Sequence, residues 1–338
     1  MDDLILLGHG SGGHLTTDLV RNLFLRNFKN ALLEPLSDSA RLPLDNPDIA
    51  FTTDSYIITP QFFLGGNIGS LAVHGTVNDI AMSGAQPLYL SAAYIIEEGF
   101  RVCQLEEIVK SMAQTAAEAG VKIVTGDTKV VPRGMADGLY INTSGIGVHR
   151  QKLGYAPDRI RKGDAIIVNG NIGDHGAAVL SSREEGFTQA EIFSDSAALN
   201  HLVAKLQDNN LTIHALRDAT RGGVGGILTE LAEQAKNSFK IYESRIPVQN
   251  RVRGMCEIYG FEPLFLANEG KMVLFCPAVE ADKIIELMHS DPLGKNAAII
   301  GEVIEEPETP EYRVIMETAI GGSRIIDQPA GELVPRIC

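Results

Sequence analysis

Four aspartates are the residues of this 338-residue chain whose type and placement best fit chemistry: Asp54, Asp79, Asp127 and Asp218. Three of the four stand beside Gly, Asn or Thr at the end of an apolar run, and Asp79 lies inside an apolar helical pattern, where Asp is unfavourable. Mg²⁺ takes few protein carboxylates and completes its octahedron with phosphate and water oxygens. Converging aspartates would therefore suit a metal–ATP site, whereas each Asp taken alone also fits a helix cap or a turn.

A glycine-rich segment near the start, Gly8-His9-Gly10-Ser11-Gly12-Gly13, could cradle phosphates. It follows an apolar run and precedes a helical pattern, the context of a dinucleotide-binding fingerprint, with Glu34 about twenty residues further on. Pro35 cuts short the second strand that such a fold needs. A mobile loop that wraps phosphates with backbone N–H groups and a flexible N-terminal arm are the other interpretations. No G-x-x-x-x-G-K-[ST] motif occurs, which excludes a P-loop.

Two segments of the second half also precede helices and could face an anion. Gly170–Gly176 lies between an expected strand and an expected helix, where backbone N–H groups can point at a phosphate, although a plain turn fits equally well. Asp218–Gly226 opens another expected helix, and Arg217 and Arg221 carry the charge that binds phosphate.

The chain ends on a thiol, Cys338. A terminal thiol on a tether can reach sites that a core cysteine cannot, but an ordinary pKa near 8.5 leaves only a few per cent thiolate at neutral pH. The adjacent α-carboxylate raises that pKa, so a host site would have to activate the sulfur; a chance terminal residue is the alternative. Lys129 and Glu269 each fit a solvated surface charge, and nothing in the sequence pairs them.

The elements that must position these residues alternate between strands and helices. In the first half we expect strands over residues 49–58, 88–96, 121–125 and 139–148, and helices over 68–83 and 105–119. Pro157 and basic residues within 154–163 mark a domain junction. In the second half we expect strands over 165–168, around 241, 271–275 and 298–303, and helices after 176 and over 197–208, 225–236, 252–259 and 281–289. This order is not strict strand–helix–strand alternation, so we predict a mixed α/β fold with mixed sheets.

Composition narrows the function classes. Lys and Arg number 29 against 43 Asp and Glu, a formal net charge of −14 that disfavours nucleic acid and anionic membranes as partners. The four cysteines include no C-x-x-C pair, so no zinc site is expected. No apolar run is long enough to span a bilayer, and the acidic start Met1-Asp2-Asp3 lacks the charge of a signal peptide, so we expect a cytoplasmic protein.

Taken together, the motifs resemble the PurM-like superfamily of ATP-dependent enzymes, which includes aminoimidazole ribonucleotide synthetase, selenophosphate synthetase and thiamine-monophosphate kinase. The motifs are the glycine-rich start, Thr52–Ser55, Val77–Ala85, Gly126–Lys129, Asn171–Gly176 and Arg217–Gly223. The ending Pro335-Arg336-Ile337-Cys338 narrows the resemblance, along essentially the whole chain, to the HypE family of hydrogenase expression/formation proteins. The reactive Cys or selenocysteine of a selenophosphate synthetase glycine loop is missing here, which disfavours that relative.

The resemblance implies a two-domain PurM-like fold. Residues 1–35 would form the glycine loop and a helix, 36–150 the N-terminal ATP-binding and dimerisation domain, 155–330 the C-terminal α/β domain, and 331–338 a flexible tail. The N-terminal domain would pair with that of a second copy, in a homodimer whose strands form a shared β-barrel.

The resemblance also implies the residues of the site. Mg²⁺ would be held by the four aspartates, and Cys338, Lys129 and Glu269 would be catalytic, with Glu269 as the base and Lys129 holding the amide or tuning Glu269 by its charge. The residues that would bind ATP are His9, Gly10, Ser11, Gly12, Gly13, Thr53, Asn78, Gly126, Thr128, Asn171, Asp174, Arg217 and Thr220.

The activity that the resemblance implies is ATP-dependent dehydration of a carbamoyl group on Cys338 to a thiocyanate. The carbamoyltransferase HypF would load the thiol, and the HypC–HypD complex would take the cyanide to the iron of [NiFe]-hydrogenase. Two alternatives differ in what they need from Cys338. A PurM-like kinase or synthetase acting on a free small molecule would not need it, and a non-catalytic scaffold would use the tail only for docking.

Overall fold

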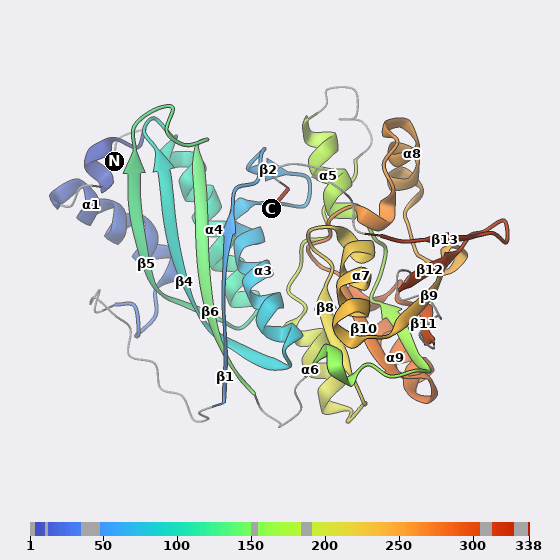
Figure 1. Ribbon diagram of the computed structural model, residues 1–338. Helices are drawn as coiled ribbons and strands as arrows, with labels where there is room; N and C mark the ends of the chain where they lie inside the picture. Colours follow the sequence, from blue (N-terminus) through green and yellow to red (C-terminus); the bar gives the residue numbers. More distant parts are fainter. Residues whose placement is uncertain are drawn as a thin grey trace.

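The computed structural model describes residues 4–10, 13–34, 48–149, 155–183, 191–304, 313–327 and 337–338. It consists of two α/β halves that lie side by side, the N-terminal half on the left of Figure 1 and the C-terminal half on the right. Each half has its own sheet, and both sheets contain parallel and antiparallel pairs. The expected mixed α/β architecture is therefore confirmed. Within the described residues, no helix has the length and apolar character needed to cross a membrane.

The N-terminal half is built on a four-stranded sheet. Its strand order is β1 (Ile49–Tyr56), β6 (Leu139–His149), β4 (Ala85–Glu97) and β5 (Lys122–Val131). Only β4 and β5 are parallel. Helices α3 (Ile68–Met82) and α4 (Val102–Glu118) cover one face of this sheet (Figure 1).

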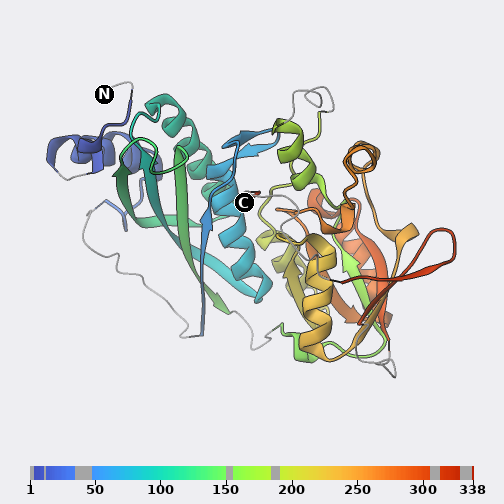
Figure 2. The same cartoon turned by 45° about the horizontal axis from the view of Figure 1, so that its top comes forward.

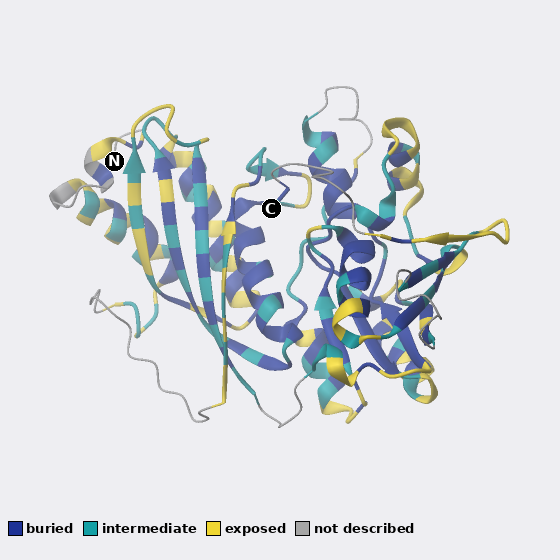
Figure 3. Cartoon of the chain, viewed as in Figure 1, coloured by how far each residue is buried: buried dark blue, intermediate teal, exposed yellow. Residues whose placement is uncertain are grey.

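The other face of this sheet carries no covering element among the described residues, and we call it the open face. Successive residues of a strand point to opposite faces, and the burial of β1 and β6 alternates accordingly (Figure 3). The alternation and the strand register assign to the open face, among others, Phe51, Thr53, Ser55, Ala93, Ile95, Asp127, Lys129, Asn142 and Ser144.

Strand β5 is longer than expected. The prediction ended it at residue 125, but its pairing with β4 continues as far as Val131. The predicted boundary was wrong because the glycine at 126 and the aspartate at 127 resemble a strand end in sequence, whereas the parallel ladder with β4 runs through both. Asp127 and Lys129 therefore lie within a strand and not in a loop after one.

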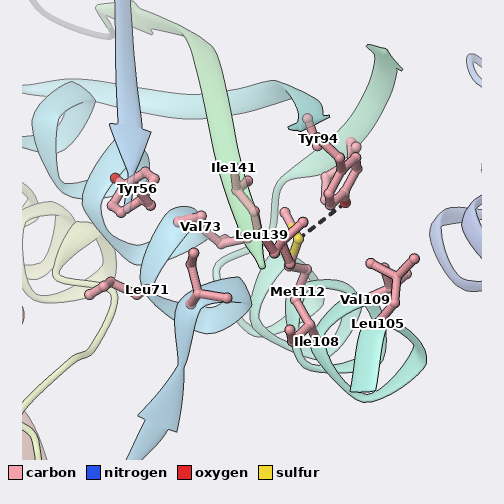
Figure 4. Packing of buried hydrophobic residues seen from close by; sticks show 14 of the residues in the cluster. Tyr56, Leu71, Val73, Tyr94, Leu105, Ile108, Val109, Met112, Leu139 and Ile141 are labelled. Carbon is pink, nitrogen blue, oxygen red and sulfur yellow. Dashed lines mark hydrogen bonds between the residues drawn. The ribbon is translucent and has the colours of Figure 1, made fainter. Parts of the chain in front are cut away.

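A helical segment and a hairpin complete the N-terminal half. The segment, which lies near β5, comprises η1 (Leu7–Gly10), α1 (Gly13–Leu19), the π-helical η2 (Val20–Leu25) and α2 (Arg26–Phe28). The hairpin of β2 (Phe62–Phe63) and β3 (Gly66–Asn67) leads into α3. The core lies between helices and sheet; Figure 4 shows part of it, with Tyr94 Oη donating to Met112 Sδ at 3.2 Å.

The C-terminal half is built on a seven-stranded sheet. Its order is β13 (Ser323–Ile325), β12 (Val314–Glu317), β9 (Ser238–Tyr242), β11 (Ala298–Ile304), β7 (Asp164–Val168), β10 (Met272–Pro277) and β8 (Ala215–Asp218). The helices are α5 (Asp174–Arg183), α6 (Asn200–Asp208), α7 (Gly223–Ala235), α8 (Asn250–Tyr259) and α9 (Ala278–His289). Short 3₁₀ turns link them at Pro157–Arg159, Glu243–Arg245, Pro263–Phe265 and Pro292–Gly294.

Helix α3 joins the two halves. Its residues Ala81 and Met82 belong to a hydrophobic cluster of the C-terminal half, and the helix also contacts α6 and β8. Figures 1 and 2 both show α3 at the boundary between the halves. His74 and Asn78 on α3 therefore face the meeting point of the two halves, where they contact Ser196 and Ala197.

Candidate active site

Helix α3 supplies the first polar residues of the site. It begins after Asn67, whose Oδ1 accepts hydrogen bonds from the N–H groups of Gly69 and Ser70 at 2.8 and 3.2 Å. Asn78, three turns along the helix, is 2% exposed. Its side chain is fully used, because Oδ1 accepts from Leu199 N–H at 2.7 Å while Nδ2 donates to carbonyl groups across the boundary.

Three of the predicted aspartates form one acidic group where β1, α3 and β8 meet: Asp54, Asp79 and Asp218. Thr52 Oγ1 donates to Asp79 Oδ2 at 2.8 Å, and Asp218 lies buried at the end of β8. Burial, followed by the charge of Asp79, raises the pKa of Asp218 to about 7. Burial also raises the pKa of Asp79, although Arg217 opposes the change. The acidic group therefore repels further negative charge and favours a cation.

This acidic group fits a cation that arrives with a nucleotide. Among the described residues, no three His, Cys, Asp or Glu side chains stand close enough to hold a metal ion by themselves. Mg²⁺ does not require three, because it is commonly held by one or two carboxylates together with substrate phosphates. The electrostatic strain between Asp79 and Asp218 is the observation that fits such an ion.

Glu269 lies on the loop that leads into β10 and is 2% exposed. Its Oε1 has no hydrogen-bond partner among the described residues. The backbone of Glu269 is held firmly, because Asn78 Nδ2 donates to its carbonyl at 3.3 Å and its N–H donates to Asp195 Oδ1 at 3.1 Å. Burial, and then the carboxylates of Asp218 and Asp195, raise the pKa of Glu269 well above its ordinary value.

A buried ion pair fixes this loop. Lys271 Nζ lies 3.0 Å from Asp195 Oδ2, and the side chains are 10% and 3% exposed. Burial would raise the pKa of Asp195, but the charge of Lys271, together with hydrogen bonds from Lys271 and the Glu269 N–H and other neighbours, outweighs burial, and the pKa is lowered. Between them, Gly270 has no space for a side chain, because a Cβ would overlap the Asp195 carbonyl. The backbone of Glu269 is thus held rigidly, while its side-chain Oε1 has no hydrogen-bond partner among the described residues.

The last two residues of the chain are seated between the halves, as the C label in Figures 1 and 2 shows. The Ile337 carbonyl accepts a hydrogen bond from His175 Nε2 at 2.7 Å, and the α-carboxylate of Cys338 accepts one from Ile57 N–H at 3.1 Å. The Ile337 side chain is 7% exposed and joins the N-terminal core. Burial, and then the charge of Glu269, raise the pKa of the Cys338 thiol to about 12.

His175 is held in one orientation by its second nitrogen. Because Nε2 donates to the tail, the neutral ring accepts at Nδ1, and Ser194 Oγ lies 2.8 Å away to donate. Burial lowers the pKa of His175, which keeps the ring neutral. The ring also packs edge-to-face on Phe63. His175 therefore acts as a fixed clamp on the tail.

Comparison with known proteins identifies the family. Residues 36–149 match the N-terminal domain of AIR synthase related proteins, and residues 161–312 match their C-terminal domain. Carbamoyl dehydratase HypE of Azotobacter vinelandii is 48% identical over 331 residues, which cover 98% of this chain and 96% of that protein. HypE of Escherichia coli K12 is 44% identical and covers 99% of both chains. The chain belongs to the HypE family of carbamoyl dehydratases.

Solved structures agree with this assignment. A HypE structure in complex with ATP has a TM-score of 0.94 at 47% identity, covering 98% of this chain and 99% of that one. HypE in a HypE–HypF complex has a TM-score of 0.80 at 47% identity, covering 92% and 99%. Thiamine monophosphate kinase of Aquifex aeolicus, 19% identical with a TM-score of 0.59 over 87% and 96%, shares the fold. The resemblance found from the motifs and the two-domain PurM-like fold are confirmed.

In this HypE-family chain, Asp127 and Lys129 lie apart from the acidic group and from Glu269. Lys129 Nζ pairs with Asp127 Oδ1 at 2.7 Å, and both side chains are more than 60% exposed. Strand register places Lys129 opposite Ile95 on the open face, whereas Asp54 points toward α3. Within one chain, the expected gathering of all four aspartates and the expected meeting of Lys129 with Glu269 are therefore not found.

The residues predicted to bind ATP are spread over both halves. Asn78, Arg217 and Thr220 lie at or next to the acidic group, and Thr53 lies on the open face. Asn171 and Asp174 line a cavity of about 390 Å³ that also reaches Lys271.

The remaining predicted ATP residues lie toward the N-terminus and β5. Gly126 and Thr128 line a cavity of about 190 Å³ against the helical segment, and His9 is buried with Nδ1 accepting from Leu6 N–H at 3.0 Å. Gly10 ends η1 and Gly13 begins α1, while Ser11 and Gly12 lie outside the described residues.

Sequence reasoning missed two residues of the site: His175 and Asp195. His175 stands in the glycine-rich motif 171–176, where a histidine among small residues was the available signal. Asp195 carries no local signal, because its partners Glu269 and Lys271 lie more than seventy residues further along the chain.

Proposed function

We propose that this chain removes water from a carbamoyl group on the sulfur of its own Cys338, at the expense of ATP, and so forms a thiocyanate. The observation that carries the proposal is the seat of the tail. Two hydrogen bonds fasten the Ile337 carbonyl and the α-carboxylate of Cys338 between the halves, close to Glu269, whose Oε1 has no partner among the described residues. An enzyme acting on a free small molecule would have no use for such a seat.

The chemistry follows from the poor leaving ability of an amide oxygen. The carbamoyl oxygen attacks the γ-phosphorus of ATP, so an O–P bond forms while the bond from the γ-phosphorus to the bridging oxygen breaks and ADP leaves. The carbamoyl nitrogen gives up its two protons, the C–O bond breaks with phosphate as leaving group, and the C≡N bond is completed. The oxygen of the lost water is carried away in the phosphate, and the two nitrogen protons pass to the base and from it to solvent.

Glu269 is the base in this proposal. A carboxylate whose pKa is raised by burial takes a proton more readily, once ionised, than an ordinary one. Burial at 2% exposure also keeps out water, which would otherwise hydrolyse the phosphorylated carbamoyl group. The rigid loop beneath Glu269 holds the carboxylate where the tail ends.

ATP is proposed to bind beside the acidic group. Asp79, Asp218 and Asp54 are the residues that would hold Mg²⁺, which when bound would neutralise charge on the transferring phosphoryl group. The positive charges of Arg217 and Arg221 act on Asp79 and oppose the rise in its pKa that burial causes. These two side chains would bind phosphate oxygens.

We propose that the protein is a homodimer in which a second copy covers the open face. Phe51 is 67% exposed there and Ile95 is 44% exposed, an unusual apolar display for a strand surface. Asp127 and Lys129 lie on the same face, so they would act in the reaction only at the dimer interface.

The tail must also leave its seat. A thiol with a pKa of about 12 is protonated at neutral pH and is a poor nucleophile, so the inward Cys338 cannot be loaded. We propose that HypF transfers the carbamoyl group to an outward tail in the cytoplasm, and that the HypC–HypD complex later receives the cyanide from an outward tail for the iron of [NiFe]-hydrogenase.

Intact-protein mass spectrometry tests the proposal. The chain is incubated with HypF and carbamoyl phosphate, and then with Mg²⁺ and ATP. A gain of one carbamoyl group followed by loss of one water, with both changes absent from Cys338→Ala, is the expected result. Carbamoylation without water loss would point to a scaffold, and no modification would point to a kinase or synthetase with a free substrate.

A further inference from the structure

The backbone of the proposed base is not held by a strand. Glu269 precedes β10, whose pairing with β8 begins at Met272. The Glu269 N–H donates to Asp195 Oδ1 at 3.1 Å, and the Glu269 carbonyl accepts from Ala197 N–H and from Asn78 Nδ2, both at 3.3 Å. Two of these three hydrogen bonds are made with residues 194–197, a stretch that we call the bridge segment.

The bridge segment also contacts the histidine that holds the tail. The segment belongs to no helix or strand. Ser194 Oγ lies 2.8 Å from His175 Nδ1, and His175 Nε2 donates to the Ile337 carbonyl of the tail. A path of hydrogen bonds therefore runs from the tail through His175 and Ser194 to Asp195 and on to Glu269. The tail and the proposed base are attached to the same four residues.

Two further elements fix the position of the bridge segment. Ser194 N–H donates to the Leu64 carbonyl at 2.8 Å, and Ser196 Oγ lies 2.8 Å from His74 Nδ1 on α3. Gly65, which has a φ of +95°, lies so close that a Cβ there would meet backbone atoms of Ser194 at 2.9 Å. The loop between β2 and β3 and helix α3 therefore both restrict movement of the segment.

Asp195 makes three contacts with the loop of Glu269. Each oxygen of its carboxylate accepts one backbone N–H, Oδ1 from Glu269 at 3.1 Å and Oδ2 from Gly270 at 3.3 Å. Oδ2 also lies 3.0 Å from Lys271 Nζ, and the Asp195 side chain is only 3% exposed. The three donors belong to three consecutive residues, so a single side chain fixes the conformation of this loop.

The free energy of folding alone does not account for this ion pair. Taking two charges out of water is costly, and a buried pair often contributes no more to stability than packed apolar side chains of similar volume would. An apolar pair could not, however, fix the directions of two consecutive backbone N–H groups. The Asp195–Lys271 pair is therefore better explained by the orientation that the carboxylate gives to the loop of Glu269.

We propose that Asp195 is a positioning residue for the dehydration, which holds the Glu269 carboxylate in place against the seated tail. Asp195 acts through the backbone of Glu269 and Gly270 and not through contact with the carbamoyl group. A displacement of about 1 Å at a reacting group can slow a reaction about a hundredfold, so bonds to the backbone of the base matter although they lie away from the reacting atoms. This inference rests on the proposed function and deepens it.

The test is Asp195→Asn, in which one acceptor oxygen replaces two, so the N–H of Glu269 or of Gly270 loses its acceptor. Carbamoylated protein is mixed with Mg²⁺ and ATP, and the loss of water and the release of ADP are followed together. We expect water loss to slow roughly tenfold or more, while carbamoylation by HypF and the dissociation constant of ATP stay close to those of wild type. With the base displaced, water can instead cleave the new O–P bond and restore the carbamoyl group, so ADP released per water lost should rise.

A second variant separates positioning from stability. Asp195→Asn leaves the ammonium group of Lys271 buried without its carboxylate, which should lower the melting temperature. Adding Lys271→Met removes the unpaired charge and should recover most of that melting temperature. It does not replace the lost acceptor, so water loss should stay slow and ADP released per water lost should stay high. Recovery of the melting temperature and of water loss together would make the pair structural and overturn the inference.

Asp164→Asn is the matched control. Asp164 is also a buried aspartate of the C-terminal half, where it accepts from Arg161 N–H at 2.8 Å and pairs with His214 Nδ1 at 2.7 Å. It stands at the start of β7, the end of that strand remote from the loop of Glu269. The same substitution there should lower the melting temperature and leave ADP released per water lost unchanged. A raised ratio in Asp164→Asn would overturn the inference.

The experiment also separates this inference from the proposed function. If carbamoylated wild type keeps its water in the presence of ATP, the proposed function itself fails. If wild type loses water and Asp195→Asn loses it at the same rate, only the positioning role of Asp195 fails.

Discussion

Replacing His175 by Phe should release the tail from its seat. The side chain donates to the Ile337 carbonyl at 2.7 Å, and its ring packs on Phe63 with the ring centroids 5.4 Å apart. Phe at this position keeps the ring contact and removes the hydrogen bonds. The Ile337 carbonyl is then left unsatisfied whenever the tail is inside.

The size of this release follows from the free-energy cost of leaving the Ile337 carbonyl without a hydrogen-bond donor. A buried acceptor that loses its donor costs about 1–3 kcal/mol. The outward tail does not suffer this cost, because water replaces the lost donor there. The ratio of outward to inward tails should therefore rise about 5- to 150-fold, since each 1.36 kcal/mol is a factor of ten.

Thiol labelling measures this ratio. Cys103 is exposed, whereas Cys256 and Cys276 are buried, so a Cys103→Ser background leaves Cys338 as the thiol whose reaction rate follows the tail. A maleimide should label Cys338 faster in His175→Phe by the factor above. Ser194→Ala, which removes only the group that orients the ring, should raise the rate about fivefold or less. Labelling at the wild-type rate in His175→Phe would refute the clamp.

Three further predictions concern the base, the pH response and the dimer. Glu269→Gln should bind ATP and accept a carbamoyl group but lose no water, which mass spectrometry would show; normal water loss would remove Glu269 as the base. Because burial raises the folded-state pKa of Glu269 above its unfolded value, the folded state binds the extra proton, and stability should fall as pH rises from about 4.5 through the raised pKa. The Gln variant should flatten this decline in melting temperature, and an unchanged slope would contradict the assignment. Phe51→Asp on the open face should shift sedimentation toward the monomer, whereas Met135→Asp in the β5–β6 turn, where Met135 is 75% exposed, should not.

Local patterns predicted most of the elements that carry the site. The spacing of apolar residues predicted a helix over 68–83, and the structure has a helix over Ile68–Met82. It also predicted a helix over 105–119, where the structure has one over Val102–Glu118. Both signals are local, because periodicity and a closing glycine lie within one element. The four motif aspartates were likewise found from their immediate neighbours.

Local sequence patterns could not predict on which face of the sheet a residue lies. Whether Asp127 points to α4 or to the open face depends on the register of β5 against β4, and register is a property of two strands. The same holds for Glu269, which looks like a surface charge in sequence. Its burial depends on Asn78 and Asp195, which approach from segments far along the chain.

The contacts that hold Ile337 and Cys338 between the halves have to be weak enough for the tail to leave again. With its pKa raised to about 12 by burial, the inward Cys338 thiol stays protonated at pH 7, whereas a few per cent of an ordinary thiol in water is ionised. Loading therefore needs the outward tail, while dehydration needs the inward one, so neither pose can dominate strongly. The inward tail is held by the hydrogen bond from His175 to the Ile337 carbonyl, of net value about 1 kcal/mol, by the one from Ile57 N–H to the Cys338 α-carboxylate, of about 1.5–3 kcal/mol, and by one buried isoleucine. An ion pair on Ile337 or Cys338 in this dry boundary would make the tail harder to release, which is a physical reason for a clamp made from a neutral histidine.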